Sequence, residues 1–409
     1  MYTEIKKCRC CESEKFTTVL SLGEQFLTGV FPKTTTEEIT KGPLDLVWCG
    51  SCGLLQMKHS YSLDEMYGDN YGYRSGLNGS MVRHLQNKIR TLELLAKPGA
   101  DDLVIDIGSN DATSLKAYSG KHHKVGIDPT GAKFKQYYTQ DITLIPDFFS
   151  ATVFRKAFPY KNAKIVTSIA MFYDLERPID FIQDIYSVLA DDGIWHFEQS
   201  YMPSMLKTNS YDTICHEHLE FYSFDVVKTM LERCDMRVVD VQMNAVNGGS
   251  FAITACKKDA GYRSNTPVIE WLLKQEDVMG LKTVRPYLDF AERVSQHRSS
   301  LKELIESLVA DGKKIIGYGA STKGNVLLQY CGLTSAHITC IAEVNEEKFG
   351  SFTPGTNIPI VSEKEARAMN PDYFIVLPWH FKHGILEREQ DYLSKGGKFI
   401  FPLPEIEIV

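Results

Sequence analysis

Two pairs of cysteines with the spacing of a metal site stand near the start of the chain. Cys8 and Cys11 form one C-x2-C motif, and Cys49 and Cys52 form a second, about 37 residues further on. Four thiolates on two such motifs fit the tetrahedral coordination of Zn²⁺, and four protein ligands leave no open position for catalysis. We therefore predict one structural zinc ion, and the C-x2-C spacing favours Cys11 over the neighbouring Cys10 as a ligand.

Two other uses of these cysteines stay open at this point. Paired cysteines can be free thiols in a reducing compartment, and a zinc ribbon can also bind nucleic acid. Nucleic-acid binding usually needs a basic face, whereas this chain carries a formal net charge of -7 at pH 7. The charge favours a structural zinc domain, and we expect no nucleic-acid partner.

A second group of residues has the pattern of a nucleotide-like cofactor site. In the run Val104–Asp111, Gly108 directly follows a short apolar stretch, and a glycine there lets a ligand approach the backbone. Asp128 ends the next apolar stretch, where a carboxylate can accept both hydroxyls of a ribose. Around these two positions we expect a set of cofactor contacts, namely Asp106, Gly108, Asn110, Asp128, Asp147 and Phe148.

The number of glycines distinguishes between two cofactors. Dinucleotide sites commonly show G-x-G-x-x-G because a pyrophosphate rests on the following helix, and here Gly108 alone precedes Ser109-Asn-Asp111. A single glycine among acidic side chains suits a cationic sulfonium ligand that has no phosphate. The pattern predicts S-adenosylmethionine. The alternative is an α/β domain in which the pattern has no function.

Two histidines flank a glutamate at His216-Glu217-His218, after the fifth apolar stretch of the middle region. If those stretches form a parallel sheet, this segment lies at its ligand-facing edge. Methylation of a carbon beside a ketone requires a base, and an imidazole suits that role near neutral pH. His218 is the predicted base and His216 its rival. Metal binding and purely structural hydrogen bonding are the other interpretations.

A glycine turn in the last third of the chain has the pattern of an anion site. Lys314–Gly319 is a predicted strand, and the residues after it open a helix toward Cys331. Backbone amides at a helix N-terminus, together with a lysine, can bind an anion. The candidate substrate-binding residues are Gly319, Ser321, Lys323 and Asn325. Glu343 also makes a nicotinamide site conceivable, although the third glycine falls too late for G-x-G-x-x-G.

Alternating strands and helices must position these side chains. Short apolar runs bounded by polar or turn residues predict buried parallel strands. The runs are Leu103–Ile107, Lys124–Ile127, Ile142–Ile145, Ile165–Ser168 and Ile194–Phe197. Pro178 suits the first turn of a helix, and Ser223 can cap another. The alternation predicts an α/β fold with a doubly wound sheet.

The length of 409 residues predicts two or three domains, and the patterns divide the chain into residues 1–75, 76–285 and 286–409. An apolar content of 43% is that of a globular protein. No run of about 18 apolar residues is present, so we expect neither a membrane span nor a membrane partner. The N-terminus lacks the apolar core of a signal peptide, which favours a cytoplasmic location.

The order of the motifs, over nearly the whole chain, resembles that of the sugar-nucleotide C-methyltransferases. The motifs are the two cysteine pairs, Val104–Asp111, Ser168–Asp174, Cys215–His218, Asn247–Ser250 and Gly317–Asn325. The resemblance implies an N-terminal zinc domain, a central class I methyltransferase domain of Rossmann-like fold and a C-terminal Rossmann-like domain. It also implies a nucleoside-diphosphate 4-keto-deoxysugar substrate, methylated at C3, whose diphosphate the C-terminal domain holds.

The resemblance also assigns roles within the catalytic segment. The family's Glu-His pair falls on Glu217 and His218, which makes His218 the base. The family's tyrosine position holds Cys215 here, and a further family histidine falls near Tyr173. Tyr173 or Tyr222 could therefore supply the hydroxyl that stabilises the enolate.

Tyr71 and Tyr73 lie on a segment that, by the same resemblance, closes over the cofactor. Aromatic rings beside a sulfonium can attract it through cation–π interactions. Packing at a domain interface is the other interpretation of these tyrosines.

Three functions agree with these patterns. The first is C-methylation of a keto-sugar nucleotide that uses S-adenosylmethionine. The second is O- or N-methylation of another small molecule, which needs no enolising base. The third is an NAD-linked sugar-nucleotide oxidoreductase that uses the C-terminal glycine turn. For the assembly we expect a monomer or a weak homodimer.

Overall fold

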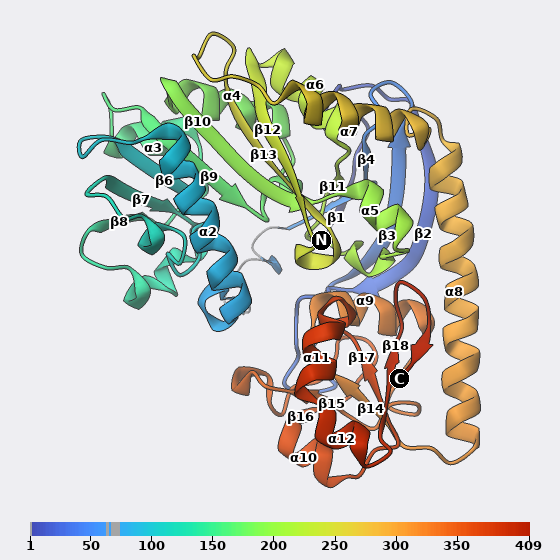
Figure 1. Ribbon diagram of the computed structural model, residues 1–409. Coiled ribbons are helices and arrows are strands. Elements are labelled where there is room, and N and C mark those ends of the chain that lie inside the picture. Colours follow the sequence, from blue (N-terminus) through green and yellow to red (C-terminus); the bar gives the residue numbers. More distant parts are fainter. Residues whose placement is uncertain (1, 63–64, 67–73) are drawn as a thin grey trace.

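The computed structural model describes residues 2–62, 65–66 and 74–409. Within these residues the chain forms a seven-stranded, a six-stranded and a four-stranded sheet, together with a two-stranded ribbon (Figure 1). None of the helices described is long and apolar enough to cross a membrane.

The seven-stranded central sheet has the strand order β12-β13-β10-β9-β6-β7-β8. Neighbouring strands are parallel except at β13, which is antiparallel to both β10 and β12. The five predicted strands are confirmed, and those at β7, β9 and β10 are longer than predicted. The bounds are β6 Leu103–Ile107, β7 His123–Ile127, β8 Ile142–Ile145, β9 Ala163–Ile169, β10 Leu189–Ser200, β12 Met236–Asn244 and β13 Ser250–Lys257.

Helices cover both faces of this sheet, and alternate residues of each strand enter two separate cores. Ile105 and Ile107 of β6 pack on the side of α3, α4, α6 and α7, whereas Val104 packs on the side of α2. Since side chains alternate along a strand, Asp106 lies on the α2 face with Val104. The helices are α2 Gly79–Ala96, α3 Ala151–Ala157, α4 Pro178–Val188, α5 Met202–Lys207, α6 Phe224–Arg233 and α7 Thr266–Val278.

Two of these helices begin as the sequence predicts. Pro178 is the first residue of α4. The Ser223 hydroxyl accepts a hydrogen bond from the backbone N–H of Val226 and caps α6. The first-turn amides of a helix have no partner inside it. Ser223 accepts from one such amide, and Pro178 has no amide hydrogen that needs a partner.

The N-terminal sheet recruits a strand from the middle of the chain. β2 (Phe16–Phe26), β3 (Lys41–Cys49) and β4 (Leu55–Met57) are antiparallel, and β11 (Glu220–Phe221) pairs with β4. The ribbon joins β1 (Tyr2–Glu4) to β5 (His59–Tyr61). The chain between β10 and α6 therefore leaves the central sheet and crosses to the N-terminal sheet.

The long helix α8 (Arg285–Ala310) runs down the outside of the molecule to the C-terminal sheet and packs against β2 and α9 (Figure 1). That sheet has the order β16-β15-β14-β17-β18-β19 and is parallel except for β19. Its strands are β14 Ile315–Tyr318, β15 Ile341–Glu343, β16 Ile360–Ser362, β17 Tyr373–Val376, β18 Lys398–Phe401 and β19 Glu407–Ile408. Its helices are α9 Thr322–Cys331, α10 Glu363–Ala368, α11 Lys382–Arg388 and α12 Gln390–Ser394.

Polar contacts hold α9 against the rest of the molecule. The Gln329 amide bonds both backbone groups of Phe26, at 2.8 and 3.1 Å. Lys323 Nζ donates to the carbonyl of Asn247, at 3.0 Å, in the loop between β12 and β13. That loop follows the carboxyl end of β12, and α9 follows the carboxyl end of β14. The ligand-facing edges of the two sheets therefore meet.

Candidate active site

The four predicted ligand sulfurs form one compact cluster. The Sγ atoms of Cys8, Cys11, Cys49 and Cys52 all lie within 4.8 Å of one another, with Cys8–Cys52 and Cys11–Cys49 both at 3.6 Å. Tetrahedral Zn²⁺ with Zn–S bonds of about 2.3 Å gives sulfur–sulfur edges of about 3.8 Å. Gly53 follows the second pair in the left-handed region, with φ of 81°. The donor set and its geometry fit zinc.

Side chains next to the cluster connect it to the rest of the fold. Cys10 is buried but lies outside the four-sulfur group, and its carbonyl accepts from Arg233 of α6 at 2.8 Å. The buried Arg9 guanidinium donates to the carbonyl of Met57 at 2.7 Å and to Glu176 at 3.2 Å. Glu176 lines the cavity described next, so the zinc domain supports one wall of that cavity.

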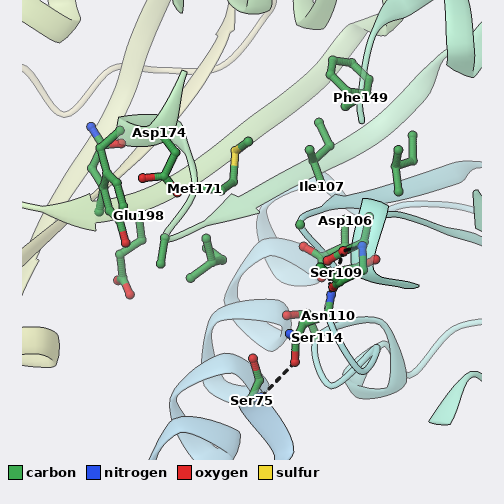
Figure 2. Close-up of a pocket in the computed structure, with 18 of the residues that line it drawn as sticks. Ser75, Asp106, Ile107, Ser109, Asn110, Ser114, Phe149, Met171, Asp174 and Glu198 are labelled. Atoms are coloured by element: carbon green, nitrogen blue, oxygen red, sulfur yellow. Dashed lines mark hydrogen bonds between the residues drawn. The ribbon is translucent and has the colours of Figure 1, made fainter. Parts of the chain in front are cut away.

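A cavity of about 390 Å³ lies over the carboxyl ends of the central strands (Figure 2). Five carboxylates line it, and its described lining includes no lysine, arginine or histidine. These carboxylates are Asp106, Asp128, Asp174, Glu176 and Glu198. An acidic wall attracts a cation, so the cavity suits a ligand with sulfonium and ammonium groups and disfavours a diphosphate.

Asp128 is held rigidly at the end of β7. Its two carboxylate oxygens accept from the backbone N–H of Asn110 and from that of Thr130, both at 2.7 Å. Gly108, with φ of 70°, turns the chain between β6 and this loop. A β-carbon on Gly108 would contact the Met171 side chain at 3.4 Å, on the wall of the cavity. The predicted glycine and aspartate therefore meet at one edge of the sheet.

Asp106 lies on the cavity wall, where burial raises its pKa to about 7 in spite of a hydrogen bond from Thr167. A ligand cation would favour the ionised carboxylate. Asn110 accepts a hydrogen bond from the backbone N–H of Ser75 at 3.0 Å, and this contact closes one side of the cavity (Figure 2).

The two residues expected near the adenine lie differently. Phe148 lines the cavity, together with Phe149, which the sequence argument did not single out. The Asp147 side chain accepts from the Phe148 backbone N–H at 2.7 Å and is absent from the described lining. Tyr71 and Tyr73 lie outside the described residues, so their predicted role stays a prediction.

Glu198 is a cavity residue that the sequence did not single out. Its carboxylate is bonded to His84 at 2.7 Å, to Lys88 at 2.6 Å and to Asn244 at 2.6 Å. Burial opposes ionisation, but these partners outweigh it and lower the Glu198 pKa to about 2. The sequence did contain one indication that Glu198 belongs to the site. Glu198 directly follows the fifth predicted strand, and residues at the carboxyl ends of such strands face the ligand.

The catalytic segment places His218 beside this cavity. Its ring packs against Tyr173, a cavity-lining residue, with centroids 4.4 Å apart. His218 Nδ1 lies 2.8 Å from the carbonyl of Thr213. A carbonyl can only accept, so Nδ1 carries the proton and Nε2 is the basic nitrogen. Burial lowers the His218 pKa to about 4, which keeps the ring neutral.

His216 and Tyr222 lie in other surroundings. His216 is fully buried, its ring meets Tyr61 edge-on at 4.6 Å, and it faces the backbone of Gln25 and Gly42. It therefore packs against the N-terminal domain. Tyr222 stacks on Phe172 with centroids 5.3 Å apart, and its pKa is raised by burial and, to a smaller extent, by the neighbouring Glu220. Neither residue is part of the described cavity lining.

Glu217 and Cys215 face one another. A hydrogen bond joins the Cys215 thiol and the Glu217 carboxylate, and burial raises the pKa of both groups. A β-carbon on Gly29 would collide with that carboxylate, and the same position lies near Thr322 at the start of α9. Glu217 thus lies where the N-terminal and C-terminal domains meet the catalytic segment.

Several of the predicted substrate-binding groups at the C-terminal glycine turn make hydrogen bonds within the protein itself. Ser321 caps α9 by accepting from the backbone N–H of Gly324 at 3.0 Å. Asn325 is fully buried and donates to the carbonyl of Thr28 at 2.8 Å. Glu343 accepts from the N–H of Ala320 at 2.7 Å, within the turn that begins at Gly319. Lys323 is the predicted residue that reaches out of this turn, toward Asn247 on the cofactor cavity.

Comparison with known proteins matches three family models to successive parts of the chain. Models of three families match the chain: a “Putative zinc binding domain” at residues 8–67, a “Methyltransferase domain” at 81–241 and a “C-methyltransferase C-terminal domain” at 245–404. The chain is 32% identical over 409 residues to the C-methyltransferase NovU of Streptomyces niveus, which covers 99% of this chain and 97% of that protein. The chain belongs to this C-methyltransferase family.

Solved methyltransferase structures are more distantly similar to this chain. The plantazolicin methyltransferase BpumL in complex with SAH is 13% identical, over 42% of this chain and 82% of that chain, with a TM-score of 0.33. An S-adenosylmethionine-dependent methyltransferase from Clostridium acetobutylicum is 7% identical, over 43% of this chain and 92% of that chain, with a TM-score of 0.34.

Membership of the family establishes the coarse activity. The protein is an S-adenosylmethionine-dependent C-methyltransferase with a class I methyltransferase fold and a zinc domain. The nicotinamide oxidoreductase and the O- or N-methyltransferase alternatives are thereby set aside. The zinc and S-adenosylmethionine predictions are confirmed, while the role of each contact residue remains a proposal.

Replacement of Cys49 by Ser should lower the zinc content of freshly purified, unchelated protein to less than about half an equivalent, because three sulfurs bind the metal more weakly than four. Elemental analysis measures the zinc content of the purified variant. The matched control is Cys10→Ser, which removes a buried thiol outside the cluster and should retain the metal. A zinc content that falls with Cys10→Ser and not with Cys49→Ser would reverse the assignment.

Replacement of Asp128 by Ala should weaken S-adenosylmethionine binding by roughly 1.5–3 kcal/mol, the scale of hydrogen bonds to a charged group. Calorimetric titration checks this. Asp141→Ala is the control, since Asp141 pairs with Lys124 at 3.0 Å and lies outside the described cavity lining. Unchanged affinity in the Asp128 variant would mean that the ribose lies elsewhere.

Proposed function

We propose that the protein methylates C3 of a nucleoside-diphosphate 4-keto-deoxysugar and that His218 removes the C3 proton. The proposal narrows the C-methyltransferase activity to one substrate class and one base. The observation that carries it is the state of His218, a neutral imidazole whose Nε2 is the basic nitrogen and whose ring contacts the wall of the cofactor cavity. A base in this position can reach a substrate that lies next to the cofactor.

The distribution of charge supports a nucleotide-sugar substrate. The cofactor cavity is acidic, whereas the first turn of α9 offers backbone amides that have no partner inside the helix. A helix N-terminus favours an anion. We place the diphosphate at this turn, beside Gly319 and Ser321. The deoxysugar then extends toward His218, and Glu217 lies between the α9 turn and His218.

Asn325 enters this proposal in a changed role. Its amide is committed to the carbonyl of Thr28, so it fixes α9 against the N-terminal domain rather than contacting the diphosphate directly. Tyr173 stays in the site because it lines the cavity and orients the His218 ring. The Glu198 carboxylate, held by His84, completes the acidic wall of the same cavity.

The reaction follows from these positions. The C3–H bond breaks, its proton passes to Nε2 of His218, and its electron pair forms the enolate with the C4 oxygen. S-adenosylmethionine supplies a methyl group activated by the positive charge on sulfur. With S-adenosylmethionine bound, the enolate carbon would take the methyl group from sulfur, which would keep the electron pair of the S–CH3 bond, and the ketone would be restored. His218 then releases its proton to solvent.

Replacement of His218 by Asn should leave both ligands bound and should lower turnover by about 10²–10⁴, the usual effect of losing a general base. Exchange of the C3 proton into deuterated solvent, followed by NMR, should fall on the same scale. His216→Asn is the matched control, and it should retain exchange because His216 packs against the N-terminal domain.

Two results would contradict this assignment. Near-normal exchange in the His218 variant would transfer the base role to another group. A wild-type product with the new methyl group at C5, the other carbon beside the ketone, would refute the C3 assignment while leaving the keto-sugar class intact.

The acid limb of kcat/KM should lie well below the ordinary histidine pKa of about 6.5. An imidazole is basic above its pKa, and burial lowers that of His218 to about 4, so the free enzyme keeps its base neutral as the pH falls from 7 to 5.5. With S-adenosylmethionine saturating, so that the cofactor cation keeps Asp106 ionised, the rate at low keto-sugar substrate should be nearly flat over that interval and decline toward pH 4. Circular dichroism at each pH checks that the fold persists. A decline centred near 6.5 would contradict the predicted state of His218.

A further inference from the structure

Lys323 is a lysine whose ammonium has no carboxylate in direct contact among the described residues, although the buried Asp212 lies within electrostatic range. It is the second residue of α9, is partly buried, and donates from Nζ to the carbonyl of Asn247 at 3.0 Å. Among the described residues no carboxylate oxygen lies within 4.0 Å of this ammonium, whereas Lys88, Lys124 and Lys164 each pair with one. Removing a charge from water without an ionic partner is costly. Such a group indicates an anionic ligand.

The charge of Lys323 acts on the catalytic segment. Burial is the main cause of the lowered His218 pKa, and the Lys323 ammonium lowers it further. The same ammonium interacts electrostatically with Asp212 and Cys215, and it lowers the pKa of His380 after burial has done so. Asn247, its hydrogen-bond partner, lines the cofactor cavity. Lys323 therefore lies within electrostatic range of the base and, through Asn247, next to the methyl donor's cavity.

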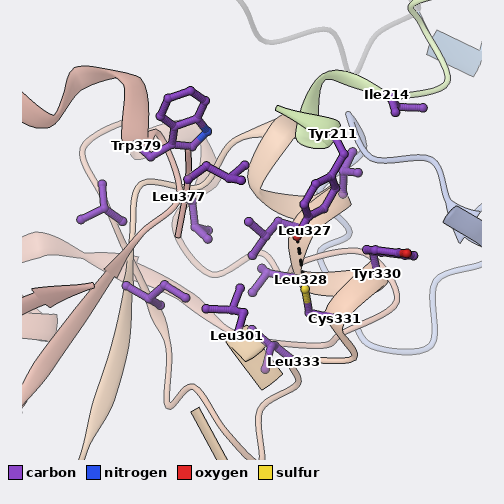
Figure 3. Packing of buried hydrophobic residues seen from close by; sticks show 14 of the residues in the cluster. Tyr211, Ile214, Leu301, Leu327, Leu328, Tyr330, Cys331, Leu333, Leu377 and Trp379 are labelled. Carbon is purple, nitrogen blue, oxygen red and sulfur yellow. Dashed lines mark hydrogen bonds between the residues drawn. The ribbon is translucent and has the colours of Figure 1, made fainter. Parts of the chain in front are cut away.

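Packing between domains fixes this arrangement. Tyr211 at the start of the catalytic segment lies against α9, and its hydroxyl is 3.5 Å from the Cys331 sulfur (Figure 3). The Trp379 indole donates to the Asp212 carboxylate at 2.8 Å and packs over Gly248 of the β12–β13 loop. These contacts join the segment, α9 and the loop around Lys323.

The enolate oxygen lacks a hydroxyl donor at the family's tyrosine position, which holds Cys215 here. The Cys215 thiol is fully buried and bonded to Glu217. The Tyr222 hydroxyl is buried near Glu220 and the first cysteine motif. An enolate requires positive charge or donors at its oxygen, and Lys323 supplies both on the side that faces His218.

We propose that the Lys323 ammonium binds the ketone oxygen of the substrate and stabilises the enolate, while the backbone amides of α9 hold the diphosphate. This inference rests on the proposed keto-sugar function. As the C–H electron pair moves into the enolate, the negative charge collects on the oxygen beside Nζ, and the proton moves to His218. When the new C–C bond forms, the electron pair of the enolate enters that bond, the oxygen loses its negative charge and the ketone is restored. Lys323 keeps its protons throughout.

The test measures enolisation apart from methyl transfer. Exchange of the protons next to the ketone is followed by NMR in deuterated solvent, with S-adenosylhomocysteine in the cofactor site and saturating 4-keto-6-deoxyhexose carried on dTDP, UDP or GDP. The variants are Lys323→Met and Lys323→Arg. The matched control is Lys314→Met, because Lys314 is also a lysine of this domain that donates to a backbone carbonyl, that of Met369 at 2.7 Å, and it precedes β14, at the end of the strand opposite the ligand-facing edge.

Lys323→Met should lower the saturated exchange rate by about 10²–10³, the effect of removing one oxyanion donor. It should leave the affinity for the free nucleoside diphosphate unchanged. Lys323→Arg should recover part of the rate because it restores the charge, and Lys314→Met should exchange like the wild type. Zinc content and melting temperature verify that each variant is folded.

A saturated rate in Lys323→Met equal to that of the wild type, with weaker nucleoside-diphosphate binding, would make Lys323 a diphosphate ligand and overturn the inference. Equal losses in the Lys323 and Lys314 methionine variants would also overturn it, since they would indicate a general structural effect. Failure of the wild type to exchange with any of the three nucleotide forms would refute the keto-sugar function itself.

Discussion

The chain between Tyr211 and Tyr222 contacts all three parts of the molecule, and the active site depends on that bridge. Its start is bonded to the C-terminal half through the Tyr211 hydroxyl, 3.0 Å from His297. Its end adds β11 to the N-terminal sheet. Between these anchors the Thr213 carbonyl sets the tautomer of His218. Since no secondary structure holds residues 214–219, their conformation is set by the surfaces on either side.

Opposite charges are separated across this bridge. Five carboxylates line the cofactor cavity, and a lysine with no carboxylate partner among the described residues faces it from α9. A sulfonium donor and an anionic acceptor would each meet the complementary side, which orients them toward one another. The reaction proposed above annihilates charge, because an enolate and a sulfonium become a neutral ketone and a neutral thioether. A site with little water favours such a step, since water stabilises the charged reactants more than the neutral products.

The zinc domain contributes to the site through support rather than chemistry. Its four sulfurs close the metal's coordination, so no position is open for a substrate. Its neighbours nevertheless reach the reacting parts, since Arg9 bonds the cavity residue Glu176 and Phe26 is bonded by Gln329 of α9. A small domain with a limited core gains rigidity from a metal, and here that rigidity extends to two walls of the interdomain space.

The sequence by itself determined the parts that rest on local spacing. The zinc ligands follow from two C-x2-C motifs, and Gly108 and Asp128 follow from adjacent parallel strands, whose carboxyl ends always meet at one edge. Only the tertiary structure decided what depends on packing between domains. It placed His218 at the cavity and His216 in the N-terminal domain, two residues apart in sequence, and it assigned Asn325 to an interdomain bond. It also brought Lys323 to the catalytic segment over more than a hundred residues of chain. Spacing along a strand or within a C-x2-C motif is fixed by covalent geometry. The positions of these side chains instead follow from how the surfaces of the three domains fit together.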